Sequence, residues 1–147
     1  MNELLAYAVL LCEGVVSDKV FNDRLDEIFL RDPNDEMLLE LECMGNAEKA
    51  AASLRARFDY GRLDKALFGR AMMKELNEYH RICGTTERFG KKMYLLWESL
   101  PGCVQDEEPF SILTYADDPL SWGDERQSRE IYEKAFGYYG QTPKGAN

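Results

Sequence analysis

The longest helical pattern in the chain is LDKALFGRAMMKELNEYHRIC, residues 63–83. Its apolar residues recur every three or four positions, at Phe68, Met72, Leu76, Tyr79 and Cys83. Residues at this spacing lie on one face of an α-helix, so the stretch predicts a long amphipathic helix. Gly84 follows, and we expect it to end the helix because glycine tolerates the backbone turn after a last helical residue.

The same periodicity continues on both sides of this stretch. It predicts helices over residues 3–13, 18–30, 33–44, 47–58 and 86–100, and a last helix that begins near Asp124 and turns Ile131, Tyr132, Ala135 and Tyr139 inward. Ser17, Asn46 and Thr85 or Thr86 are expected helix caps, and Asp32 with Pro33 predicts the start of the third helix. No segment alternates apolar and polar residues as a sheet requires. The sequence therefore predicts an all-α fold, a compact bundle of about six to seven helices.

Residues 103–121 are the ambiguous part of the chain. Phe110 to Tyr115 fits either a short helix after Pro109 or an isolated extended segment, and we expect a helical turn inside an irregular acidic loop. At 147 residues the chain has the size of one domain. We expect a single helical domain over residues 1–139 and a flexible C-terminal tail over residues 140–147.

The composition of the chain restricts its expected cellular location and the expected state of its cysteines. The longest apolar run, Ala8 to Cys12, is too short to cross a membrane. No Lys or Arg precedes Lys19, so a secretory signal lacks its positive start and a cytoplasmic location is expected. The four cysteines form no CxxC pair, and we expect reduced, packed thiols because free cysteine is commonly buried.

Charge is spread unevenly along this chain of net charge −9. Residues 1–45 hold three basic and eleven acidic side chains, residues 46–100 hold eleven and seven, and residues 101–147 hold four and nine. The chain is therefore acidic at both ends and basic in the middle. Complementary charge accelerates the encounter of two proteins, so the acidic segments are candidate surfaces for binding a partner.

Two acidic surfaces can be drawn. The acidic face combines two neighbouring helices and contains Asp23, Asp26, Glu27, Asp35, Glu36 and Glu40. The acidic loop, residues 103–125, has no basic residue and contains Asp106, Glu107, Glu108, Asp117, Asp118, Asp124 and Glu125 together with Phe110, Tyr115 and Trp122. One interpretation is that these carboxylates are solvated helix surfaces and that the aromatic rings fill the core. The other is that the carboxylates and the Tyr115 and Trp122 rings recognise a basic partner.

Catalytic and metal chemistry has little support in the sequence. His80, the single histidine, lies three residues before Cys83, but no third group orients such a pair. Two ligands do not make a zinc site, and the phosphate-loop, dinucleotide, serine-hydrolase and zincin motifs are absent from the sequence. We therefore expect no catalytic residue, no metal and no cofactor. A site made of carboxylates alone, for example among Glu75, Glu78, Glu87 and Glu98, leaves no sequence signature and stays open.

The sequence favours a non-catalytic acidic interaction protein that masks a basic surface of a partner. Such a surface could be the nucleic-acid channel of a nuclease or toxin, as for inhibitor, immunity or anti-defence proteins. The alternative is a helical regulatory or adaptor domain that binds a protein, or itself, through its apolar and basic middle. A carboxylate enzyme is the third hypothesis. Direct binding of nucleic acid by the basic middle is disfavoured because a protein of net charge −9 repels a polyanion. The partner and the oligomeric state do not follow from the sequence.

Overall fold

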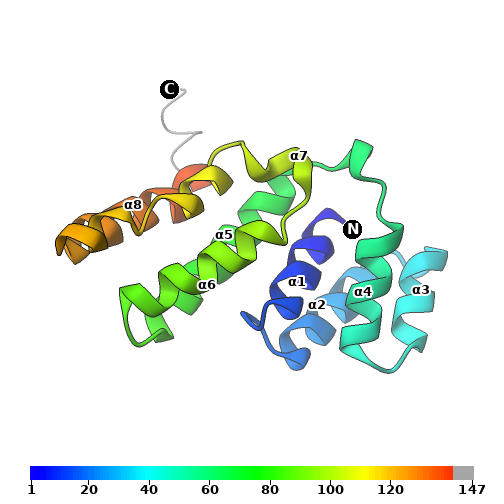
Figure 1. Cartoon of the computed structure of the whole chain (residues 1–147). Coiled ribbons are helices and arrows are strands. Elements are labelled where there is room, and N and C mark those ends of the chain that lie inside the picture. The colour runs from blue at the N-terminus through cyan, green and yellow to red at the C-terminus, as the bar shows by residue number, and fades with distance from the viewer. Residues whose placement is uncertain (141–147) are drawn as a thin grey trace. The chain divides into compact units, whose positions relative to one another are not determined.

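Helices build the part of the chain that the computed structural model describes, residues 1–140, and no strand occurs among these residues (Figure 1). The predicted all-α fold class is confirmed. The chain divides into two compact units, one of residues 1–72 and one that begins at residue 73. The single domain expected over residues 1–139 stays a prediction. Apart from Gly140, the tail expected at residues 140–147 lies outside the described residues.

Helix α1 (Asn2–Cys12) forms the core of the first unit. Every residue from Leu4 to Leu10 is buried, so this helix has no solvent-facing side along its middle. A helix of this kind is stable only when other elements surround it. Helices α2 (Asp18–Arg31) and α4 (Ala47–Arg57) both pack against α1, and α3 (Glu36–Cys43) packs against α2 and α4.

The start of α3 differs from its expected position. The backbone N–H of Asp35 donates to the Asp32 carbonyl, which closes a turn before the helix, and the Asp35 side chain then accepts from the Leu38 N–H. Asp35 is therefore the cap, and the prediction that the helix starts at Pro33 is wrong. Met44 follows Cys43, the last residue of α3, and its side chain is 37% exposed.

Helix α5 (Lys65–Ile82) follows a short 3-10 turn, η1 (Tyr60–Arg62). It starts two residues later than expected because Asp64 Oδ1 accepts from the first-turn N–H groups of the helix. Met72 ends the first unit and Met73 begins the second. The predicted inward residues Phe68, Met72 and Leu76 are buried, whereas Tyr79 and Cys83 are half-buried.

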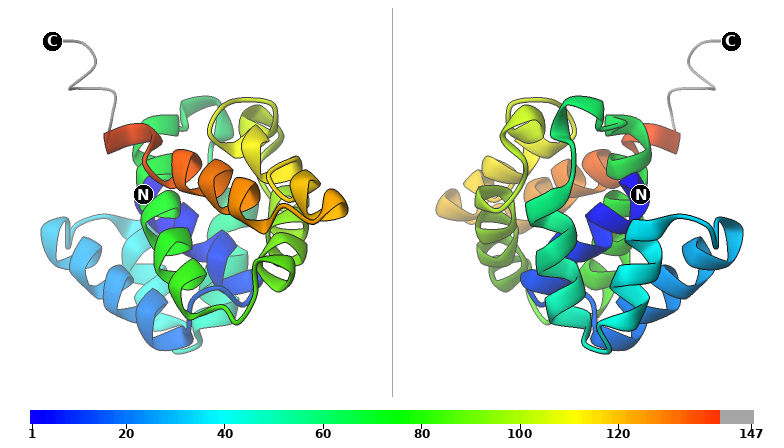
Figure 2. Two further views of the ribbon diagram at one scale, coloured as in Figure 1. Left: turned by 90° about the vertical axis from the view of Figure 1, so that its left-hand side faces the viewer. Right: turned by 90° about the vertical axis from the view of Figure 1, so that its right-hand side faces the viewer.

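In the second unit, α6 (Thr86–Glu98) and α8 (Glu125–Phe136) are joined by the acidic loop. That loop is helical in short pieces: α7 (Gly102–Gln105), η2 (Phe110–Thr114) and η3 (Asp118–Trp122). Segment η2 packs on α6, α7 and α8, and η3 packs on α8, as the yellow and orange segments in Figure 2 show. The helical turn expected over Phe110 to Tyr115 is confirmed.

Aromatic rings fill the space between α5, α6 and α8 in this unit. The Phe89 ring meets the Tyr132 ring edge to face at 4.9 Å and the His80 ring at 4.7 Å, and Phe136 lies 5.9 Å from Phe89. Edge-to-face contacts stabilise a core beyond simple burial. Trp97 lies at the edge of this core: it is half-buried, and its Nε1–H donates to the Gln105 carbonyl at 2.9 Å.

The cysteines do not occupy the buried positions expected for them. Cys12, Cys43 and Cys103 are exposed and Cys83 is half-buried. Within residues 1–140, no helix combines the length and the apolar content needed to cross a bilayer.

Candidate functional site

The acidic loop is anchored to the second unit by its apolar residues. Phe110 and Leu113 are each 1% exposed, Ala116 is fully buried and Pro119 is buried. These side chains point into the unit from η2 and η3, and they hold the intervening polar residues at its surface. The loop therefore presents its charges from a fixed backbone, and it is not an unstructured insertion.

Two aromatic side chains of the loop lie at the surface. Trp122 is 63% exposed and Tyr115 is 44% exposed. Trp122 ends η3, and Gly123 then turns the chain back with a φ of 80°, a left-handed conformation that favours glycine. The interpretation of Trp122 and Tyr115 as core-filling rings is therefore excluded, and Phe110 is the loop aromatic that fills the core.

The carboxylates of the loop differ in their surroundings. Asp106, Glu107, Glu108 and Asp118 are exposed. None of the ion pairs of residues 1–140 involves Asp106, Glu108, Asp117 or Asp118. Asp124 has a structural role, because its side chain caps α8 by accepting from the Gln127 N–H at 3.0 Å. Much of the loop's negative charge is thus not neutralised by the described residues.

Asp117 is a structural part of the loop as well as a charge. It is half-buried against α6, and a Cβ on Gly90 would lie only 2.9 Å from the Asp117 Cβ and 3.2 Å from the Tyr132 hydroxyl. Gly90 therefore permits a close approach between α6 and the loop. Tyr132 is fully buried, its hydroxyl has no hydrogen-bond partner among residues 1–140, and burial first and Asp117 second raise its pKa above the ordinary value. Asp117 is less suited to partner contact than Asp118.

The acidic face of the first unit is largely neutralised by its own neighbours. Asp23 pairs with Lys19 at 2.7 Å, Glu27 pairs with Arg24 at 2.9 Å, and Glu40 pairs with Arg57. Asp35 serves as the cap of α3. Helices α2 and α3, which carry the acidic face, pack against each other, and the prediction that Asp23, Asp26, Glu27, Asp35, Glu36 and Glu40 form one binding surface stays a prediction. The carboxylates of the acidic face nevertheless present less unpaired negative charge to a partner than those of the acidic loop do.

Sequence reasoning missed one carboxyl pair on this face. Asp26 and Glu42 line a pocket of about 290 Å³ between α2, α3 and α4, and the Glu42 Oε1 atom is buried without a hydrogen-bond partner among residues 1–140. Burial first, and then the Asp26 carboxyl, raise the pKa of Glu42 to about 7. No local signal could have found the pair, because its members lie on different helices. The raised pKa of Glu42 favours a protonated carboxyl at this position.

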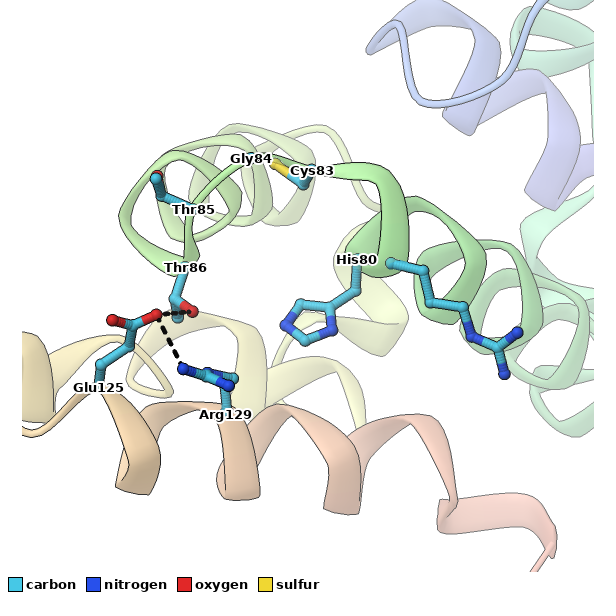
Figure 3. Close-up of a pocket in the computed structure, with 8 residues that line it drawn as sticks. His80, Cys83, Gly84, Thr85, Thr86, Glu125 and Arg129 are labelled. Carbon is cyan, nitrogen blue, oxygen red and sulfur yellow. Dashed lines mark hydrogen bonds and ion pairs between the residues drawn. The ribbon is translucent and has the colours of Figure 1, made fainter.

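His80 lines a second pocket, of about 320 Å³, at the ends of α5, α6 and α8 (Figure 3). Its ring extends towards α8, whereas Cys83 lies at the α5–α6 turn, so the two do not form a nucleophile and base. Burial lowers the pKa of His80, with Glu133 raising it and Arg129 lowering it by smaller amounts. His80 is thus a mainly neutral ring packed on Phe89.

The basic middle is also divided among local ion pairs. Arg57, Arg62, Arg81 and Lys91 bind Glu40, Asp59, Glu78 and Glu87 respectively. Within the described part of the chain, no three His, Cys, Asp or Glu side chains gather closely enough to hold a metal ion.

No protein-family model, curated protein or solved structure matches the chain.

Proposed function

We propose that the protein is a non-catalytic interaction protein whose acidic loop covers a basic surface of a partner protein, such as the nucleic-acid channel of a nuclease or toxin. The observation that carries the proposal is the exposure of Trp122, at 63%, on an anchored segment whose neighbouring carboxylate Asp118 has no cation partner among residues 1–140. Large exposed aromatic side chains are enriched among the residues that dominate binding energy.

Charge supports the same proposal. Asp106, Glu108 and Asp118 lie on a segment without a basic residue, so their field is not cancelled locally. A negative surface steers a positive partner during diffusion and raises the association rate, most strongly at low salt. The acidic loop meets this requirement better than the acidic face, where Asp23 and Glu27 already hold cations.

Rigidity is the third support. Binding by a flexible loop loses affinity because the loop must be ordered, and a loop anchored through Phe110 and Leu113 avoids most of that cost. The hydroxyl of Ser121 donates to the Asp118 carbonyl at 2.8 Å, which further fixes the turn that carries Trp122. Such a preorganised surface suits an inhibitor that must compete with nucleic acid for a basic channel.

The test starts with differential capture of partners. Wild-type protein and an Asp118→Lys, Trp122→Ala double variant are used as baits, and proteins retained by the wild type alone are identified. We expect at least one strongly basic nucleic-acid enzyme in this set, with its activity inhibited by the wild-type protein. Partners that bind both baits equally would contradict the proposal.

Binding kinetics with the captured enzyme then separate charge from anchor. Asp106→Lys with Asp118→Lys should slow association about tenfold and flatten its salt dependence. Trp122→Ala should instead speed dissociation about tenfold, as expected for an anchor ring. Glu48→Lys with Glu98→Lys is the charge-matched control on exposed residues outside both acidic surfaces, and it should bind nearly as the wild type does.

A further inference from the structure

The pocket of His80 lies where three helix ends of the second unit meet. The end of α5 contributes His80, the start of α6 contributes Thr86, and the first turns of α8 contribute Glu125 and Arg129 (Figure 3). Its volume of about 320 Å³ is in the range of small-molecule sites. This pocket is not used by the proposed function, and of its lining residues only Glu125 belongs to the acidic loop.

Two donors from different helices already hold an oxyanion in this pocket. The Thr86 hydroxyl donates to Glu125 Oε1 at 3.1 Å, and the Arg129 guanidinium donates to the same oxygen at 3.2 Å. In Figure 3 both groups point at the Glu125 carboxylate. A guanidinium and a hydroxyl that converge on one oxygen match the way proteins bind carboxylate and phosphate groups.

The resident carboxylate is held weakly. The Glu125 and Arg129 side chains are 51% and 54% exposed, and solvent-exposed ion pairs contribute little to stability. Thr86 itself is only 5% exposed, so its hydroxyl stays in place when Glu125 moves away. An anion of higher charge can therefore replace the side chain on donors that remain fixed.

The other charges near the pocket are of both signs, since Arg81 pairs with Glu78 and Glu133 acts on His80. Arg81 is a lining residue, and the Arg88 guanidinium reaches within 3.7 Å of the position that a Cβ on Gly84 would take. Glu125 is the one carboxylate among the lining residues that the structure describes. Arg129 is thus the cation that contacts the displaceable carboxylate directly, whereas Arg81 is paired with Glu78 at 3.5 Å and Arg88 lies outside the lining residues.

His80 provides a different kind of contact. Its ring nitrogens have no hydrogen-bond partner among residues 1–140, and its ring packs edge to face on Phe89. A neutral imidazole can donate or accept one hydrogen bond, which suits a hydroxyl group attached to an anion. The pocket is also larger than a bare phosphate ion requires.

We propose that this pocket binds a small phosphate monoester, whose phosphate replaces the Glu125 carboxylate on Thr86 and Arg129. Phosphate is preferred to a ligand carboxylate because it carries more negative charge than the group that it must displace. Its hydroxyl-bearing part then lies towards His80. In the absence of ligand, Glu125 occupies the phosphate position.

The test is an NMR titration of the ¹⁵N-labelled protein with glycerol phosphate, and in parallel with inorganic phosphate, at constant ionic strength. Saturable shifts of Thr86 and of the Arg129 side chain are expected for both probes, with tighter binding of the ester. Arg129→Gln should weaken binding roughly tenfold or more, because it removes a charged donor. Glu125→Gln should tighten binding roughly two- to fivefold, because it removes the competing charge.

Arg126→Gln and Glu130→Gln are the matched controls, since these residues form an exposed i,i+4 pair on the same helix and do not line the pocket. Both controls should bind the ester as the wild type does. If Arg129→Gln does not fold, Thr86→Val removes the second donor with little change in shape, and it should also weaken binding. The proposal is overturned by the absence of saturable shifts, by weakening in the controls equal to that in the site variants, or by weaker binding in Glu125→Gln.

Discussion

Glu42 illustrates how one residue can make stability depend on pH. Its pKa rises from 4.5 to about 7 in the folded protein because the carboxyl is partly buried beside Asp26. Between pH 4.5 and about 7, the Glu42 carboxyl is therefore protonated in the folded state and already ionised in the unfolded state. This contribution to stability is present below pH 4.5 and is lost as the pH rises through about 7.

Replacing Glu42 by Gln should remove this dependence. We expect Glu42→Gln to stabilise the protein relative to the wild type at pH 8 and to flatten the decline of stability between pH 5 and pH 8, since an amide of nearly the same shape carries no charge. Urea unfolding at several pH values measures the effect. Glu36→Gln, at an exposed position on the same helix, is the control and should leave the pH dependence unchanged. A Glu42→Gln curve parallel to that of the wild type would contradict the assignment.

The surroundings of Gly90 predict the opposite effect of a Gly→Ala substitution on stability to the one that helix propensity predicts. In the middle of a helix, Gly→Ala normally stabilises by about 0.5–1 kcal/mol. Here the new methyl group would lie 2.9 Å from the Asp117 Cβ, so the loop or the helix must shift. We expect Gly90→Ala to destabilise by about 1–3 kcal/mol, as overpacking does. Gly102→Ala has open space around its new methyl group, and in the same thermal melts it should show no such loss.

At the scale of elements, the end of α6 is tied to α7 by a reciprocal pair of hydrogen bonds. The Trp97 indole donates to the Gln105 carbonyl at 2.9 Å, and the Gln105 amide donates to the Trp97 carbonyl at 3.0 Å. Trp97→Phe should cost about 1 kcal/mol through the lost hydrogen bond. Trp97→Ala should cost about 2–3 kcal/mol because half of a large ring is also lost from packing. Tyr94→Ala, at an exposed residue of α6, should cost much less in the same unfolding measurements.

Local signals predicted most of the helices. Ser17, Asn46 and Thr85 cap the helices that they were expected to cap, because a cap acts on residues two or three positions away. The same reasoning predicted that α3 starts at Pro33. Asp32 and Asp35 are equally able to cap a helix, and only the geometry of the turn between them makes Asp35 the cap. Short-range patterns thus predicted which elements exist more reliably than where they begin.

The candidate surfaces depended on information that the sequence lacks. The acidic loop was visible as a run of carboxylates without a basic residue. Which carboxylates lack cations was not visible, because the pair of Glu40 and Arg57 joins residues far apart in the chain. The exposure of Trp122 and of three cysteines also depends on tertiary packing, and composition alone misled the expectation for the cysteines.

At the scale of the whole molecule, the two units should respond to pH in opposite directions. Stability of the first unit falls as the pH rises from 4.5 to about 7, through Glu42. In the second unit, burial lowers the pKa of His80 below its ordinary value of 6.5, so the unfolded state takes up a proton first as the pH falls. The contribution of His80 is therefore present above pH 6.5 and is lost on acidification.

Hydrogen exchange resolves the two responses within one sample. Between pH 7 and pH 5, after correction for the intrinsic exchange rate, the opening free energies of α2 to α4 should increase relative to those of α6 and α8. His80→Gln should remove the acid sensitivity of α6 and α8 and leave that of α2 to α4 unchanged, and Glu42→Gln should do the reverse. Equal changes in every helix would show that other groups dominate the pH dependence.

Because the two tryptophans differ in exposure, the intrinsic fluorescence of the protein should report on each of them separately. Indole emission shifts to longer wavelength in water, so Trp122, at 63% exposed, should supply the red, easily quenched part of the spectrum. Trp97, half-buried and bonded to Gln105, should supply the blue part. A partner that covers the acidic loop would then shield Trp122 from acrylamide while the emission of Trp97 stays constant, and unfolding would move both. Binding and unfolding can therefore be read separately from unlabelled protein, with Trp122→Phe assigning each component.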